Sequence, residues 1–207
     1  DGNWLFGLDT LQTVVDVFKI NKSNGGLTLT AQTPYPVPNA VVVPKMVRVS
    51  PVGNLVFIAI GTAGDVVFTF DTSTGALAIS QTLTFTSGNS SDNALAIDKA
   101  GQNLYIGRTG DSGGIWVYTI GAAGFLSSVA GSPFPAGSQP NALVIDPTGK
   151  YLYAANRGDN NISGYAIGTN SAGGTSPSEG WRQRRSASRP TMRAEPRWYC
   201  GWYSMLS

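Results

Sequence analysis

The side chains best suited to chemistry in this sequence lie in two short segments, Arg108 to Asp111 and Asn156 to Asp159. An arginine can bind a carboxylate or phosphate group through two parallel hydrogen bonds. An aspartate can act as a general base toward water that attacks a carbonyl carbon. We therefore take Arg108, Asp111, Asn156, Arg157 and Asp159 as candidate ligand-binding residues. Asp and Asn also accept backbone hydrogen bonds in turns, so a structural role remains open for each of them.

Two features of the composition narrow the chemistry. The sequence contains no histidine, which excludes Ser-His-Asp and Cys-His catalytic sites and histidine-liganded zinc. Its only cysteine is Cys200, so neither an intrachain disulfide nor a thiolate metal cluster can form. We therefore expect no metal site. The residue types alone do not identify a catalytic group.

The net charge of +2 is the sum of two unlike segments. Residues 1–175 carry eight Lys or Arg and ten Asp, a balance of −2, whereas residues 176–207 carry six Arg and two Glu, a balance of +4. The basic excess belongs to the C-terminal segment, so we do not expect nucleic acid to be a partner. No run of 18 apolar residues occurs, and no membrane span is expected.

The elements that would position the candidate residues follow from a repeat of about 48 residues. A glycine, an aromatic residue four positions later and a second aromatic 11 to 13 positions beyond that recur along the chain. The glycines are Gly2, Gly53, Gly101 and Gly149, the first aromatics are Phe6, Phe57, Tyr105 and Tyr153, and the second aromatics are Phe18, Phe68, Tyr118 and Tyr165.

Each repeat divides into four short β-rich segments between Gly, Pro, Asn and Asp turns. Three of them are clearest at 142–145, 151–155 and 162–167, and the fourth is clearest one repeat earlier, at 125–129. Copies of such a meander arranged around an axis bury one another's apolar faces. We therefore predict an all-β fold of four-stranded antiparallel β-propeller blades, an incomplete ring of about 3.5 blades over residues 1–172. A two-sheet sandwich is the main structural alternative.

The loops of such blades alternate between two faces, because successive strands are antiparallel. The loops that hold Asp111 and Asp159 share one face with the long connection 132–140. We expect ligands to bind on this long-loop face, at the mouth of the channel lined by the first strand of each blade. Asp98 and Asp146 precede glycine turns on the other face and are expected to be turn formers.

The sequence also resembles a known family. The run Gly131-Ser132-Pro133-Phe134-Pro135-Ala136-Gly137 and the run Ile-Asp-Pro-Thr-Gly-Lys-Tyr-Leu-Tyr-Ala-Ala-Asn at 145–156 carry the resemblance. Both are similar to runs in the lactonase-type seven-bladed β-propellers, which include 6-phosphogluconolactonase-like proteins and grade into YVTN-type surface repeats. The resemblance covers about residues 1–172.

This resemblance implies hydrolysis of a sugar lactone such as 6-phosphogluconolactone, without a cofactor. The alternative is a non-catalytic propeller that serves as a binding or cell-surface interaction module, which the low charge and abundant Ser and Thr would suit. A third reaction, that of the related muconate-lactonising propellers, is disfavoured because a histidine would be expected there.

Seven blades of this length need about 340 residues, so the resemblance also implies that the chain is a fragment of a propeller. Open blade edges would then favour self-association. The repeats stop near residue 174, and we interpret 173–207 as an irregular or disordered tail. Its wealth of Arg, Ser, Pro and Trp suggests a segment read out of frame, and a natural basic tail is the alternative. The compartment stays open between periplasmic or extracellular and cytoplasmic.

Overall fold

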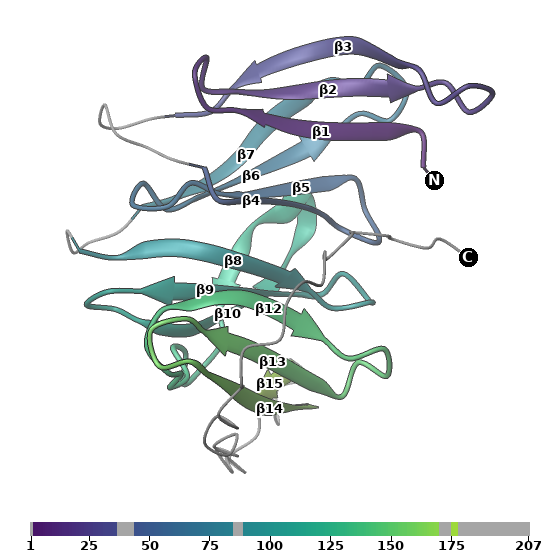
Figure 1. Cartoon of the computed structure of the whole chain (residues 1–207). Coiled ribbons are helices and arrows are strands. Elements are labelled where there is room, and N and C mark those ends of the chain that lie inside the picture. The colour runs from purple at the N-terminus through teal and green to yellow at the C-terminus, as the bar shows by residue number, and fades with distance from the viewer. Residues whose placement is uncertain (1, 37–43, 85–88, 170–174, 178–207) are drawn as a thin grey trace, which may run out of the picture.

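A computed structural model describes residues 2–36, 44–84, 89–169 and 175–177 of the chain. These residues form four antiparallel sheets that follow one another in chain order (Figure 1). The strands are β1 (Trp4–Asp9), β2 (Val14–Ile20), β3 (Leu27–Pro34), β4 (Met46–Val49), β5 (Leu55–Ala59), β6 (Asp65–Phe70), β7 (Leu77–Leu83), β8 (Ser91–Ile97), β9 (Asn103–Thr109), β10 (Gly114–Ile120), β11 (Leu126–Ser128), β12 (Pro140–Ile145), β13 (Tyr151–Asn156), β14 (Asn161–Thr169) and β15 (Thr175–Pro177).

Each sheet is one propeller blade. Blade I consists of β1 to β3, blade II of β4 to β7, blade III of β8 to β11 and blade IV of β12 to β15, and each strand pairs with its neighbours in sequence. The four predicted segments fall on β12, β13, β14 and β11. The all-β prediction of propeller blades built as antiparallel meanders is therefore confirmed. Blade I has three strands among the described residues, and its β1 matches the second strand of the other blades.

The turn between β12 and β13 shows why this sequence changes direction where it does. The Asp146 carboxylate accepts hydrogen bonds from the backbone amides of Thr148, Lys150 and Tyr151 at 3.0, 2.9 and 2.7 Å. Gly149 then adopts a φ of 73°, which suits a residue without a Cβ. Asp98 accepts the amide of Gln102 in the same way, at 2.7 Å. Both aspartates are turn formers, as predicted.

The repeating aromatic residues fill the spaces between blades. Phe57 packs with Leu95 and Ile106 in the core between blades II and III, where it is 1% exposed. Tyr105, its counterpart one repeat later, belongs to the core between blades III and IV and is fully buried. The 48-residue repeat is therefore a repeat of packing, because blades I, II and III each supply one anchor aromatic to the core shared with the next blade.

The outward face of blade IV is exposed. Val144, Tyr153 and Ile162 lie on it and are 59%, 41% and 53% exposed, since no described blade covers them. The anchor aromatic of this repeat, Tyr153, is thus half-exposed, while Phe57 and Tyr105 in the two preceding repeats are buried. The predicted self-association through open blade surfaces stays a prediction.

Two further expectations concern the chain as a whole. No helix among the described residues is long and apolar enough to cross a membrane. Most of the predicted tail, residues 178–207, lies outside the described residues, so the out-of-frame hypothesis also stays a prediction. The last described strand, β15, falls three residues beyond the predicted end of the propeller.

Candidate ligand-binding face

The long-loop face contains a polar hollow of about 630 Å³. Its walls come from the blade III loops and from the connection that leads into blade IV. The β13–β14 loop is tied to that connection, because the amides of Arg157 and Gly158 donate to the carbonyls of Gln139 and Ser138 at 2.9 and 3.0 Å. The residues that line the polar hollow are Asn89, Arg108, Thr109, Gly110, Asp111, Gly113, Gly114, Ala136, Gly137, Ser138, Gln139 and Pro140.

Arg108 lies at the wall of the polar hollow with its charge already paired. Its Nε and Nη2 atoms donate to the two carboxylate oxygens of Asp92 at 2.7 and 2.9 Å. The guanidinium also lies over the ring of Trp116, 4.4 Å from its centroid, and the Arg108 side chain is only 7% exposed. Burial alone would lower the pKa of Arg108, but the hydrogen bonds and charge of Asp92 raise it.

Asp65 is the third charged residue at this point, where blades II and III meet. It is 2% exposed, and neither of its carboxylate oxygens has a hydrogen-bond partner among the described residues. Burial, and then the neighbouring charge of Asp92, raise the pKa of Asp65 well above its usual range. These effects favour the protonated acid. We call Asp65, Asp92 and Arg108 the buried charged cluster.

The loop before β6 brings this cluster together. The Asp92 amide donates to the carbonyl of Gly61 at 3.0 Å, and the Ile60 amide donates to the carbonyl of Gly64 at 2.9 Å. The first contact joins blade III to blade II, and the second closes the loop that leads to Asp65. Within the part of the chain that the structure describes, no group of three or more His, Cys, Asp or Glu residues gathers as a metal site.

Comparison of the repeats shows that Asp65 departs from the blade pattern. It pairs with the residue two positions after the anchor aromatic, where blades I and III place Val15 and Ile115. Both of those side chains are fully buried aliphatics. The sequence analysis missed Asp65 and Asp92. Asp65 could have been found from the sequence, because it places a carboxylate at a repeat position where blades I and III have Val15 and Ile115.

Three further candidates gather around the Ala136–Pro140 segment. Asp111 is exposed and lines the polar hollow directly. The Asp159 carboxylate accepts the Ser138 amide at 2.8 Å, which holds that segment in place. Asn156 is 1% exposed and donates to Asn161 and Ser163 at 2.7 and 2.8 Å, so it supports the wall from behind.

Arg157 is the candidate that the structure places apart. Its backbone amide joins the wall of the polar hollow, but Arg157 is exposed and is one of the residues, with Asn156 and Ile162, that line a separate hollow of about 410 Å³. That second surface belongs to the outward side of blade IV. The structure therefore brings Arg108, Asp111 and Asp159 together at the polar hollow, whereas Arg157 lines the separate hollow and the buried Asn156 lies between the two.

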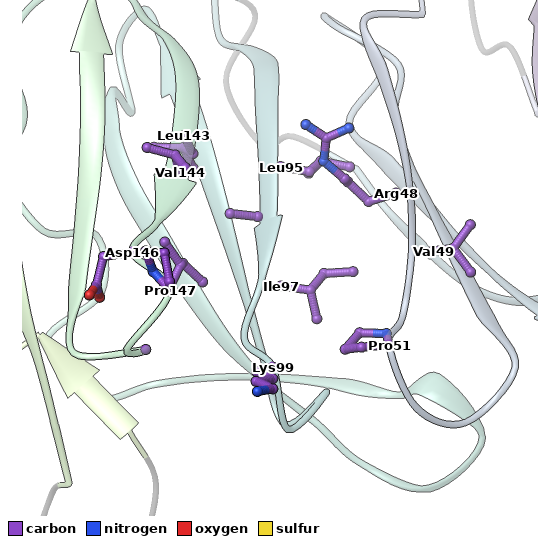
Figure 2. Close-up of a pocket in the computed structure, with 13 residues that line it drawn as sticks. Arg48, Val49, Pro51, Leu95, Ile97, Lys99, Leu143, Val144, Asp146 and Pro147 are labelled. Carbon is purple, nitrogen blue, oxygen red and sulfur yellow. The ribbon is translucent and has the colours of Figure 1, made fainter. Parts of the chain in front are cut away.

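A further hollow, of about 440 Å³, lies along the inner strands β4, β8 and β12 near the glycine turns (Figure 2). Leu95, Ile97 and Pro51 present carbon atoms to it, and Arg48 and Lys99 lie at separate ends in this view. Asp146 also borders this hollow, but its oxygens are occupied by turn amides. The polar hollow on the long-loop face is thus the better candidate for recognition of a polar ligand.

The family follows from a sequence comparison. A family model described as lactonase, seven-bladed β-propeller, matches residues 49–177, more than half of the chain. The chain belongs to this lactonase family. The match includes nearly all of blades II to IV, and with them the polar hollow and the buried charged cluster.

Solved structures show the same fold at low identity. A candidate 6-phosphogluconolactonase from Bacteroides uniformis is 24% identical with a TM-score of 0.72, over 86% of this chain and 51% of that protein. The periplasmic gluconolactonase of Pseudomonas aeruginosa is 21% identical with a TM-score of 0.68, over 84% of this chain and 49% of that protein. The chain thus spans about half the length of these lactonase-family relatives. No curated protein matches the sequence.

Proposed function

We propose that this lactonase-family propeller hydrolyses a sugar lactone at the polar hollow on its long-loop face. One observation carries the proposal: the residues that match the family contain a polar hollow large enough for a small sugar ring, about 630 Å³. The names of the two solved relatives, a candidate 6-phosphogluconolactonase and a gluconolactonase, support a sugar lactone as the substrate class.

To catalyse lactone hydrolysis, a protein has to orient the lactone and a water molecule and to transfer protons. The oxygen of a water molecule bonds to the lactone carbonyl carbon, the bond from that carbon to the ring oxygen breaks, and the ring oxygen takes up a proton. A carboxylate beside the bound ring can accept the proton that the attacking water loses. Asp111 is the exposed carboxylate that lines the polar hollow, and we assign it this general-base role.

The test is a lactone hydrolysis assay on the full chain, with gluconolactone and 6-phosphogluconolactone, against the spontaneous rate. We expect Asp111→Asn to lower kcat/KM about 100-fold, because removal of a general base typically costs that much. Asp16→Asn is the matched control, since it makes the same change of charge on β2 of blade I.

A rate equal to the spontaneous background for both lactones would contradict the enzyme assignment. If the chain still bound sugars under those conditions, the non-catalytic binding module would be the function that remains. A rate above background that Asp111→Asn leaves unchanged would retain the lactonase and remove Asp111 from its mechanism.

A further inference from the structure

We infer that the polar hollow selects uncharged sugar lactones and discriminates against phosphorylated ones. This inference names the substrate class of the site in the proposed function and rests on that proposal. It rests on which charged groups line the polar hollow and on whether each of them is already paired. Among the described residues that line it, the charged ones are Arg108 and Asp111.

The positive charge of Arg108 is already paired with a carboxylate inside the protein. Both carboxylate oxygens of Asp92 accept hydrogen bonds from it, and Asp92 is fully buried. A phosphate group that recruited this guanidinium would leave the Asp92 carboxylate buried without its cation, next to the equally buried Asp65. With Asp65 protonated the buried charged cluster is neutral, and with Asp65 ionised it is negative. In neither state does it attract a dianion.

Apart from Arg108, the charged side chains that border the polar hollow or bond to its wall are negative. Asp111 is exposed on the wall of the polar hollow, and the Asp159 carboxylate binds the amide of Ser138 in the same wall. A phosphate placed here would meet like charges, and among the described residues that line the polar hollow the one cation, Arg108, is already paired with Asp92, which selects against the phosphate. Arg157, the neighbouring cation of the loop, is not among the residues that line the polar hollow and borders the separate hollow on blade IV instead.

The remaining lining groups suit a neutral ring. The side chains of Asn89, Ser138 and Gln139, which line the hollow, can donate to or accept from sugar hydroxyls. An uncharged lactone needs only such dipolar partners.

The experiment compares glucose with glucose 6-phosphate, two stable ring compounds that differ by the phosphate alone, in NMR titrations of the full chain at low ionic strength. We expect glucose to bind at least about 10-fold more tightly, with the difference narrowing as added salt screens the carboxylates. Asp111→Asn should reduce the ratio of the two affinities several-fold. Asp16→Asn and Arg157→Gln should leave that ratio as it is.

Equal or tighter binding of glucose 6-phosphate, or no binding of glucose, would overturn the inference. Its failure is distinguishable from failure of the proposed function. A chain that prefers glucose but hydrolyses no lactone keeps the inference and loses the activity. A chain that hydrolyses 6-phosphogluconolactone faster than gluconolactone keeps the activity and loses the inference.

Discussion

Asp65 lies where other blades bury an aliphatic side chain, and this position sets the pH at which it ionises. Burial, and then the charge of Asp92, raise its pKa in the folded chain well above the usual range. In the unfolded chain Asp65 would release its proton near pH 4. Between these two pKa values the folded state holds one proton that the unfolded state has lost. The contribution of Asp65 to stability is therefore present in acid and is lost as the pH rises through this window.

We predict that Asp65→Asn removes this pH dependence. The amide is neutral at every pH, and its N–H groups are able to donate to a neighbouring carboxylate such as Asp92. The free energy of unfolding of the unaltered chain should fall with pH in this window by up to about 1.4 kcal/mol per pH unit. In the variant that slope should be absent. Urea denaturation between about pH 4 and 8 measures this slope in the unaltered chain and in Asp65→Asn. Asp16→Asn is the control, and its unfolding free energy should depend on pH as that of the unaltered chain does.

An identical slope in Asp65→Asn and in the unaltered chain would mean that Asp65 titrates normally. The buried charged cluster would then have to hold an ionised Asp65.

At the scale of elements, the loops on the long-loop face depend on a close approach between two backbone segments. Gly110 has a φ of 88°, and a Cβ added there would lie 1.7 Å from the carbonyl oxygen of Asn89. Gly149, in a turn of the other face, has a similar φ of 73°, but a Cβ there would meet nothing within 4 Å. Gly110 and Gly149 therefore have similar φ values, but only at Gly110 does a neighbouring backbone atom also exclude a Cβ.

We predict that Gly149→Ala costs about 1 kcal/mol of unfolding free energy, the price of a left-handed conformation alone. Gly110→Ala should cost about 3 kcal/mol, because the Asn89 carbonyl belongs to the backbone and cannot turn aside as a side chain would. Chemical denaturation of the two variants gives the comparison. Equal losses would show that the loop can open to admit a methyl group.

At the scale of the whole molecule, the exposed apolar surface of blade IV is the outstanding feature. Val144, Tyr153 and Ile162 are each more than 40% exposed, although Phe57 and Tyr105, the equivalents of Tyr153 in blades II and III, are buried. Large apolar surfaces of this kind tend to associate in water. We propose that the chain self-associates through this face.

The corresponding prediction is that Tyr153→Lys lowers self-association. A charge at the centre of the exposed surface would have to be desolvated on contact, so sedimentation velocity should show a shift toward monomer. Leu11→Lys is the control, because Leu11 is 94% exposed but belongs to the loop between β1 and β2. A chain that is monomeric before any substitution would contradict the proposal.

Much of the blade architecture could be predicted because its determinants are local. The glycine turns, the alternation within strands and the aromatic anchors each act within a few residues, and the strands of blade IV fell where those signals placed them. The surroundings of the candidate residues were less predictable. Asn156 and Arg157 are adjacent in sequence and both border the separate hollow on blade IV, but Asn156 is buried and Arg157 is exposed.

The sequence by itself determined the repeating meander, the family and the face on which the long loops gather, since turn chemistry and a 48-residue spacing are properties of the linear chain. Only the tertiary structure decided how the charges pair. Asp92 and Arg108 are 16 residues apart in sequence but lie opposite each other on β8 and β9. Asp65 lies close to both because blades II and III pack together. Desolvation and pairing depend on what surrounds a group in space. From the sequence alone, Arg108 could bind a ligand, but in the folded chain its guanidinium is paired with the buried carboxylate of Asp92.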